Sequence, residues 1–309
     1  MRKIFGIGET VLDIIFKDGQ PQTAKAGGSV LNSMVSIGRI GLPVSFISEY
    51  GKDDVGELIE NFLICNGVNT DSVHRFEKGN TSLALAFLDK KNDAHYSFYK
   101  EFPSKRLETI FPALQSDDIL LFGSFYAIWT DIREKIKPFV QNSYNKGALI
   151  IYDPNFRKSH LSEIDILKPL IIENMRMASI VRGSDEDFMN IFGVNNADGA
   201  WDAVKNNCKC LIYTASSDGV FIKTDSFTGR FPVTQISPIS TIGAGDNFNA
   251  GLIASIYNKN LNKEKLTTLD RDEWESIIKV AVEFATNVCL SYENYISEEF
   301  AAEIKNRFK

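Results

Sequence analysis

The sequence lacks several features that would settle its class at once. It has no Gly-x-x-x-x-Gly-Lys-Ser/Thr motif, which excludes a P-loop nucleotide hydrolase. It has no run of about 18 apolar residues that could cross a membrane, since the best candidate, residues 119–129, is interrupted by Gly123 and Ser124. Glu9 and Asp13 break the apolar stretch that a signal peptide would need. We therefore expect a soluble, cytoplasmic protein without a membrane partner.

Cysteine and histidine are also scarce, with four and three residues in a chain of 309. There is no Cys-x-x-Cys pair, and no histidine completes a ligand spacing around Cys208-Lys209-Cys210, so neither a disulfide framework nor a structural zinc site is expected. Buried, reduced thiols are the natural alternative. The net charge of −6 and a pI near 5.3 argue against a general nucleic-acid-binding surface.

What the sequence does contain is a regular alternation of strand-like and helical patterns. This order predicts a mostly parallel sheet with helices on both faces. Strands are expected at 4–7, 44–48, 119–122, 149–152, 179–181 and 211–213, and helices at 30–40, 55–65, 132–144 and 164–172. We read residues 1–309 as a single domain without internal repeats, in which the polar stretch 258–273 is expected to be a long loop.

Two segments do not fit the alternation. One is residues 11–16. The other consists of residues 83–88 and 95–98, which are joined by 89–93 and look like a hairpin.

A glycine-rich turn at residues 239–251, Ile-Ser-Thr-Ile-Gly-Ala-Gly-Asp-Asn-Phe-Asn-Ala-Gly, precedes a helical pattern. Gly243, Ala244 and Gly245 allow backbone N–H groups to converge at a helix N-terminus, which suits phosphate or a developing negative charge. Asp246 follows in the first turn and could simply be a helix-dipole partner. A carboxylate beside a phosphate site would repel the ligand, however, so a base that accepts a proton from a substrate hydroxyl explains it better.

Two other glycine-rich patches lie near the N-terminus. Residues 6–11 follow a strand, but Val11 stands where a dinucleotide-binding turn needs a small residue, so a Rossmann dehydrogenase fits poorly. Residues 26–41, Ala-Gly-Gly-Ser-Val-Leu-Asn-Ser-Met-Val-Ser-Ile-Gly-Arg-Ile-Gly, form a tight turn that leads into an amphipathic helix.

The patches at 26–41 and 239–251 together resemble the paired signatures of the PfkB, or ribokinase-like, family of carbohydrate and nucleoside kinases. Matches extend from Gly8 to about Ser291. The resemblance implies a three-layer α/β/α sandwich with a mostly parallel central sheet. It also implies a small β-sheet lid over the sugar, formed by segments near 10–26 and 73–102, through which a homodimer could form.

The resemblance assigns sugar-binding roles to several residues. Asp13 would hold two sugar hydroxyls, since a buried hydroxyl without a partner is costly, and Gly27, Gly28 and Asn32 lie on the sugar-contacting turn. From the residues alone, Asp13 could instead be an exposed turn carboxylate, and Asn32 could cap or pack within its helix.

Residues 153–157, Asp-Pro-Asn-Phe-Arg, follow a predicted strand and resemble a motif of family members that act on fructose and on keto-deoxy sugar acids. Arg157 would bridge a substrate carboxylate and the transferring phosphate, a task suited to its planar fork. Lys100 is a second candidate for the carboxylate. The alternative for Arg157 is a salt bridge to Asp153 that only shapes the loop.

Nucleotide contacts are implied at four places. Ser184 and Asp187 replace the family's Asn-x-x-Glu, which helps to order water around the nucleotide's magnesium, so Asp187 is an indirect metal ligand in this interpretation. A helix N-cap with an acidic first turn is the alternative. The remaining contacts implied by the resemblance are Thr214, Ser216 and Gly219 in a Thr-x-Gly-x-x-Gly-like loop, and Asn287. A plain β-turn at 218–219 is the alternative for this loop.

The implied activity is ATP- and Mg²⁺-dependent phosphorylation of a sugar hydroxyl. Asp246 would accept the proton, and the N–H groups of residues 242–245 would stabilise the transferring phosphoryl group. The Gly-Glu-Thr-Val-Leu-Asp and Asp-Pro-Asn-Phe-Arg runs look most like those of fructokinases. The alternatives are a 2-keto-3-deoxygluconate-type sugar-acid kinase, a nucleoside kinase and, in a different class, a catalytically inactive sugar-sensing protein, suggested by Ser184, Ser216 and Ser240.

Ser240 stands where many relatives have an aspartate that helps to hold K⁺. A neutral hydroxyl is a poorer ligand for a hard cation than a carboxylate. We therefore expect weak or absent activation by K⁺, with Ser240 and Thr241 holding the turn by hydrogen bonds.

Overall fold

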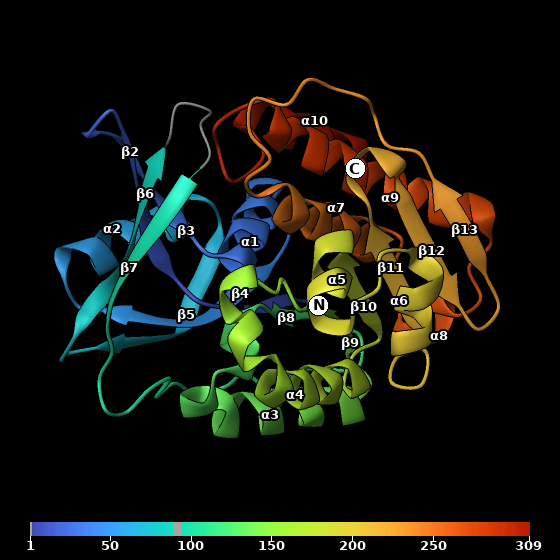
Figure 1. Ribbon diagram of the computed structural model, residues 1–309, viewed down its shortest axis with the longest axis horizontal. Coiled ribbons are helices and arrows are strands. Elements are labelled where there is room, and N and C mark those ends of the chain that lie inside the picture. Colours follow the sequence, from blue (N-terminus) through green and yellow to red (C-terminus); the bar gives the residue numbers. More distant parts are fainter. Residues whose placement is uncertain (1, 89–93) are drawn as a thin grey trace.

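The computed structural model describes residues 2–88 and 94–309, and its framework is a nine-stranded sheet (Figure 1). From one edge to the other the strands are β13 (Thr228–Phe231), β12 (Val220–Thr224), β11 (Cys210–Thr214), β10 (Ile180–Ser184), β9 (Leu149–Asp153), β8 (Ile119–Gly123), β1 (Ile4–Ile7), β4 (Val44–Gly51) and β5 (Val68–Phe76). Neighbouring strands from β11 to β5 are parallel, and β12 and β13 are antiparallel additions. The predicted parallel sheet is confirmed.

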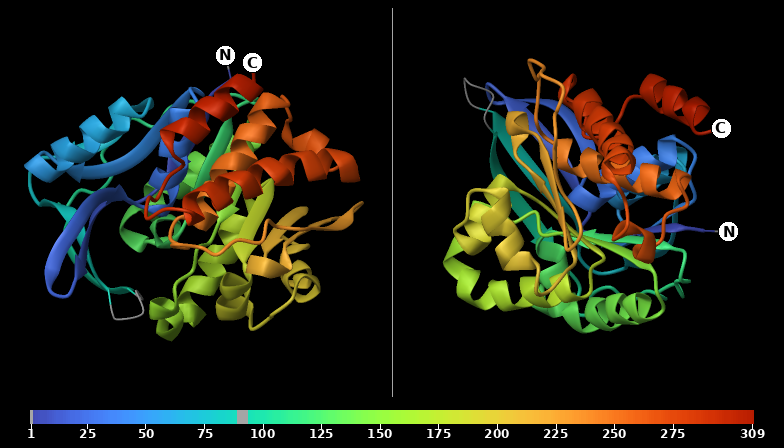
Figure 2. Two further views of the ribbon diagram at one scale, coloured as in Figure 1. Left: turned by 90° about the horizontal axis from the view of Figure 1, so that it is seen from above. Right: turned by 90° about the vertical axis from the view of Figure 1, so that its right-hand side faces the viewer.

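Helices cover both faces of this sheet (Figure 2). The first face is covered by α1 (Ser29–Arg39), α2 (Asp54–Cys65), α7 (Ala244–Asn258), α8 (Lys263–Leu266), α9 (Arg271–Cys289) and α10 (Glu298–Arg307). The second is covered by α3 (Thr130–Asn145), α4 (Ile164–Arg176), α5 (Asp185–Phe192) and α6 (Ala197–Val204). Strand β8 shows why both faces need helices. Its side chains are apolar on both sides, so Ile119 and Leu121 enter one core while Leu120 and Phe122 enter the other.

A smaller four-stranded sheet forms the lid, in the order β3 (Gln20–Gly27), β2 (Val11–Lys17), β6 (Asn80–Leu88) and β7 (Ala94–Glu101). The expected antiparallel hairpin of β6 and β7 is confirmed, although its connection, residues 89–93, lies outside the described residues. The expected lid segment 73–102 began too early, because residues 73–76 extend β5 along β4 in the main sheet.

The polar stretch 258–273 is not a continuous loop. It contains the short helix α8, whose N-cap Asn262 accepts a bond from the Lys265 N–H at 3.1 Å. Leu261, Leu266 and Leu269 are buried in the core. These three apolar side chains hold the segment against the protein. The prediction of a loop rested on the charged residues of the segment and took no account of them.

Three of the four cysteines are buried, but Cys65 at the end of α2 is exposed, so the expectation of buried thiols was wrong for that residue. Across residues 2–88 and 94–309, no helix has both the length and the apolar character to cross a membrane.

The topology determines where functional residues can meet. Strands β1, β9, β10 and β11 are parallel, so their carboxyl ends lie at one edge of the sheet, where open α/β sheets bind ligands. Helices α1 and α7 pack side by side above that edge, and the lid sheet begins at Val11, four residues after β1.

Candidate active site

Helix α7 begins in the glycine-rich turn. Its N-cap, Gly243, has a left-handed φ of 79°, and a Cβ there would lie 2.9 Å from the carbonyl oxygen of Asn294. A Cβ on Gly245 would lie 2.9 Å from Nη1 of Arg182. Backbone conformation and close packing therefore both require glycine in this turn.

Two of the four N–H groups expected to face a phosphate are used inside the turn. The Ile242 N–H donates to Oγ of Ser240 at 3.2 Å, and the Ala244 N–H donates to the Thr241 carbonyl at 3.3 Å. The N–H groups of the two glycines have no partner among the described residues. The turn is thus held partly by Ser240, as expected, and its open donors are those of the glycines.

Helix α1 holds Asp246 in place. Asn32 donates from Nδ2 to Oδ2 of Asp246 at 2.8 Å, and Ser33 donates from Oγ to the Asp246 carbonyl at 2.7 Å. Burial raises the pKa of Asp246 to about 6, although the bond from Asn32 favours the ionised form. Asn32 therefore orients a carboxylate 214 positions away in the sequence, instead of capping its own helix.

Asp13 lies on strand β2 of the lid and is not an exposed turn carboxylate, so that alternative was wrong. Burial raises its pKa to about 7, and the charges of Asp246 and Glu9 add to the effect. A Cβ on Gly27 would lie 2.0 Å from Oδ2 of Asp13, and one on Gly28, whose φ is 132°, would lie 2.1 Å from the Glu9 carbonyl. The two glycines let the chain pass close to this carboxylate.

The carboxylate of Asp153, at the end of β9, is fully engaged. Its Oδ2 accepts bonds from Nη1 of Arg182 at 2.8 Å and from Nδ2 of Asn249 at 2.7 Å, and Oδ1 accepts the Asn155 N–H at 3.0 Å. The alternative of a salt bridge from Arg157 to Asp153 was therefore wrong. Arg157 is exposed, and its charge lowers the pKa of Asp246, so it faces the same site.

The glycine turn and the two carboxylates lie together in one site. A carboxylate with a pKa of about 6 lies at the mouth of a helix with open N–H donors, and a second carboxylate with a pKa of about 7 lies close enough to interact with it. A base beside an anion-binding turn can accept a hydroxyl proton while the turn stabilises an anionic group.

The profile of the pfkB family carbohydrate kinases matches residues 1–299. The chain belongs to this family. It is therefore a phosphotransferase that acts on sugar hydroxyls, with the ribokinase-like α/β fold.

Several kinases are similar to this chain over most of its length. A fructokinase from Rhizobium leguminosarum bv. trifolii is 27% identical over 274 residues, which are 85% of this chain and 82% of the relative. Aminoimidazole riboside kinase from Salmonella enterica, solved with aminoimidazole riboside and an ATP analogue, superposes with a TM-score of 0.84 at 19% identity over 99% of both chains. A fructokinase double mutant from Vibrio cholerae O395 was solved with fructose, ADP and potassium ion. It superposes with a TM-score of 0.81 at 20% identity, over 95% of this chain and 94% of the mutant's chain.

Ser184 and Asp187, which are predicted to occupy the family's Asn-x-x-Glu position, form a capping box at the start of α5. The Asp187 carboxylate is 5% exposed and accepts the Ser184 N–H at 2.7 Å, the Ser184 hydroxyl at 2.6 Å and the Phe156 N–H at 2.6 Å. The N-cap interpretation is confirmed. The water-mediated magnesium role of Asp187 stays a prediction, and its oxygens already have protein donors.

The loop after β11 is a short 3₁₀ turn, residues 216–218, rather than a plain β-turn. Ser216 has a φ of 40°, a conformation that glycine adopts without strain. Gly219 has a φ of 106°, and a Cβ there would lie 2.5 Å from the Phe231 carbonyl. The Thr214 hydroxyl accepts a bond from Nη2 of Arg182 at 2.9 Å.

Lys100 and Asn287 both have protein partners. Lys100, on lid strand β7, forms an ion pair with Glu9, and its Nζ lies 5.2 Å from the centre of the Trp129 ring. Asn287 accepts the Ser297 N–H at 2.9 Å and so fastens the chain that follows α9.

Arg182 and Asn249 are the residues of this site that sequence reasoning missed. Arg182 stands two residues before Ser184 in a buried strand, and Asn249 stands one helical turn after Asp246. Polar residues at buried positions beside a glycine-rich turn were the signal that could have found them.

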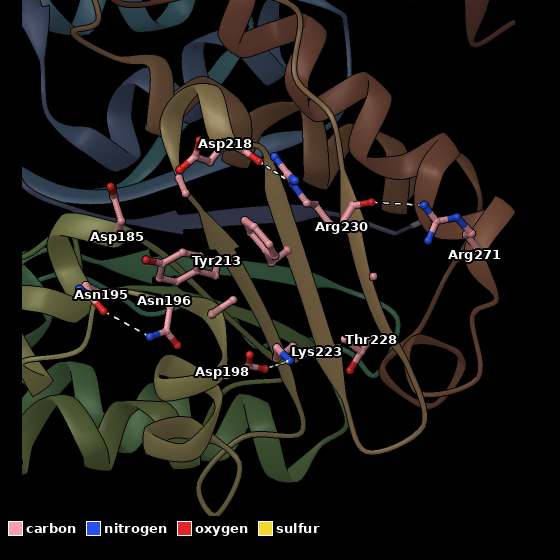
Figure 3. A pocket seen from close by; sticks show the side chains of 14 residues that line it. Asp185, Asn195, Asn196, Asp198, Tyr213, Asp218, Lys223, Thr228, Arg230 and Arg271 are labelled. Carbon is pink, nitrogen blue, oxygen red and sulfur yellow. Dashed lines mark hydrogen bonds and ion pairs between the residues drawn. The ribbon is translucent and has the colours of Figure 1, made fainter.

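A separate cavity of about 580 Å³ lies between α6 and strands β11 to β13 (Figure 3). None of the predicted site residues lines it. Its cations are engaged within the protein, because Lys223 pairs with Asp198, and Nε of Arg230 donates to the Asp218 carbonyl at 2.8 Å. Volume alone does not make this cavity the reaction site.

Proposed function

We propose that this kinase phosphorylates a hydroxyl of fructose or of a closely similar neutral sugar. The observation that carries the proposal is the ion pair between Glu9 and Lys100, because it neutralises one of the two cations that could have bound a sugar carboxylate. A site with its cation already paired suits a neutral substrate. The similarity to fructokinases supports the same choice.

In the proposed reaction, residues of this chain bind the sugar, accept a proton from it and stabilise the transferring phosphoryl group. Asp13 and the turn at Gly27 and Gly28 hold the sugar through its hydroxyls, and Asp246 accepts the proton of the attacking hydroxyl. The hydroxyl oxygen then bonds to the γ-phosphorus of ATP, and the bond to the ADP oxygen breaks. The open N–H groups of Gly243 and Gly245, with Ala244 between them at the helix start, stabilise the negative charge of the transferring group.

The nucleotide is proposed to lie along Thr214, Ser216, Gly219, Ser184 and Asn287. When bound, Mg²⁺ would neutralise negative charge on the phosphate groups of ATP. Among the described residues no group of three acidic, histidine or cysteine side chains could hold a metal ion. We therefore propose that Mg²⁺ arrives with the nucleotide and that Asp187 acts only on its water shell.

Two other substrates each have a supporting observation. The side chain of Arg157 is exposed and has no hydrogen-bond or ion-pair partner among the described residues, which favours a 2-keto-3-deoxygluconate-type sugar acid. The similarity to aminoimidazole riboside kinase favours a nucleoside-like substrate. A sugar-sensing protein without turnover is disfavoured, because Asp246 and its turn are intact.

Substrate preference is tested by ADP release with fructose, 2-keto-3-deoxygluconate and aminoimidazole riboside. We expect kcat/KM to be highest for fructose. Glu9→Gln should free the charge of Lys100 and raise kcat/KM for the sugar acid by roughly tenfold, the effect of one modest electrostatic contact. Arg157→Ala should lower turnover of the acid more than that of fructose if Arg157 binds the carboxylate.

The double variant Glu9→Gln with Lys100→Met is the matched control, because it removes both charges and should lose the gain. A higher kcat/KM for the acid or the riboside in the unmodified protein would reject fructose as the substrate.

Activation by K⁺ is expected to be weak, because Ser240 replaces a carboxylate ligand. Assays in a sodium- and potassium-free buffer, with K⁺ then added, should show less than about tenfold activation, which is about 1.4 kcal/mol of transition-state stabilisation. Ser240→Asp should increase the response. Strong activation of the unmodified protein would contradict the role given to Ser240.

Dimer formation through the lid stays a proposal. The lid strand β7 carries Phe98 and Tyr99, 58% and 59% exposed, and exposed aromatic side chains of this kind are common in interfaces. Sedimentation velocity would measure the oligomeric state, and a monomer at every concentration would exclude the dimer.

A further inference from the structure

Arg182 lies directly beneath the glycine turn. It is 7% exposed on strand β10, and its guanidinium packs against Gly245, where a Cβ would lie 2.9 Å from Nη1 and 3.3 Å from Nη2. The ring of Phe248, in the first turns of α7, lies 5.3 Å from its Cζ. The guanidinium of Arg182, paired with Asp153, therefore lies under the turn whose Gly243 and Gly245 N–H groups have no partner among the described residues.

A single network connects Arg182 to three neighbouring elements. It reaches Asp153 on β9 at 2.8 Å and the Thr214 hydroxyl on β11 at 2.9 Å. Asn249 on α7 bonds to the same Asp153 oxygen at 2.7 Å. Helix α7, which carries Asp246, is thus tied to three strands of the sheet at the level of the reaction site.

Stability alone gives a poor reason for this arrangement. Burying two charges costs several kcal/mol of desolvation for each ion, and apolar residues of similar volume are often as stable or more stable. The Nε of Arg182 is buried without a partner among the described residues, which adds to the cost. An anion-binding turn, in contrast, gains directly from an arginine that neutralises a carboxylate beneath it.

The charges around Asp246 come from several elements. Those that face it are Asp13 of β2, Asp153 of β9, Arg157 of the following loop and Arg182 of β10, with the neutral Asn32 of α1. Asp153 raises the pKa of Asp246, whereas the two arginines lower it. Without Arg182, Asp153 would be an unpaired carboxylate beneath a site that must accept phosphate.

We propose that Arg182 is a positioning residue for phosphoryl transfer, which holds α7 against the sheet and cancels the negative charge of Asp153 beneath the Gly243–Gly245 turn, so that the turn can accept an anionic phosphate. The inference rests on kinase activity and not on which sugar is the acceptor.

The test compares Arg182→Gln with Arg182→Lys. Gln keeps a donor for Asp153 but loses the charge, and Lys keeps the charge but cannot bond to Asp153 and Thr214 as a fork. Arg133→Gln is the matched control, because Arg133 is also buried, pairs with Glu173 and lies away from the site. ATP affinity is measured by calorimetry without sugar, and kcat/KM is measured against pH with the best sugar found.

For Arg182→Gln we expect ATP affinity to fall at least tenfold, and the acid limb of kcat/KM to move up by about one pH unit, as loss of a nearby opposite charge does. Arg182→Lys should keep ATP affinity within about threefold and leave the limb in place, and Arg133→Gln should lower only the melting temperature.

ATP affinity and an acid limb unchanged in a folded Arg182→Gln would overturn the proposal. If that variant fails to fold, a loss of ATP affinity in Arg182→Lys as large as tenfold would overturn it as well. A failure of fructose as substrate would leave the nucleotide measurement untouched, so the two proposals can fail separately.

Discussion

Asp246→Asn is expected to lower kcat by about 10²- to 10⁴-fold while ATP still binds, because the amide cannot accept the hydroxyl proton. The substitution keeps the shape of the side chain and can keep a contact with Asn32. Steady-state kinetics at saturating ATP and sugar measure the loss, and calorimetry with ATP checks that the turn remains intact.

The matched control is Asp185→Asn. Asp185 is an exposed carboxylate in the first turn of α5, so it shares the helix-dipole environment of Asp246 but not its neighbours. A change of less than about twofold is expected there. Near-normal turnover in a folded Asp246→Asn variant would reject the base assignment and leave Asp246 with the helix-dipole role alone.

The same assignment predicts a pH dependence. Burial raises the pKa of Asp246 to about 6, so the carboxylate is mostly ionised at pH 7 and becomes protonated below pH 6. Because only the ionised form accepts the proton, kcat/KM should fall about tenfold per pH unit below that value. An acid limb near pH 4, the ordinary range of an aspartate, would show that burial does not raise the pKa of this carboxylate.

Gly27→Ala is expected to raise the KM for the sugar by about 10- to 100-fold with little effect on ATP affinity. The backbone at Gly27 suits any residue, but the new Cβ would lie 2.0 Å from Oδ2 of Asp13, so this short side chain must leave its position. Asp13→Ala should give a loss of similar size, because it removes the acceptor for the sugar hydroxyls.

A double-mutant cycle tests whether the two changes act through one contact. If Gly27→Ala works by displacing Asp13, it should cost less than about threefold in KM once Asp13 is already alanine. Fully additive losses would show that the glycine acts on the sugar directly, and an unchanged KM in both single variants would remove Asp13 from the sugar site.

The sequence by itself determined the features that depend on neighbouring residues or on a repeating pattern. The alternation of apolar runs predicted the parallel sheet, because strands buried on both faces must be continuously apolar. The glycine turn with Asp246 could also be predicted from the sequence, because the backbone conformation of a turn and the polarity of a helix start depend on a few consecutive residues.

Only the tertiary structure decided which partner each polar side chain has. Asn32 bonds to Asp246 across 214 positions, Asp153 pairs with Arg182 instead of the nearby Arg157, and Lys100 pairs with Glu9 across 91 positions. A buried charge bonds to whatever group the packed elements bring within about 3 Å. The packing of strands and helices determines which groups come this close, whatever their separation in the sequence. The sequence could therefore identify the candidate groups, but it could not show which of them pair.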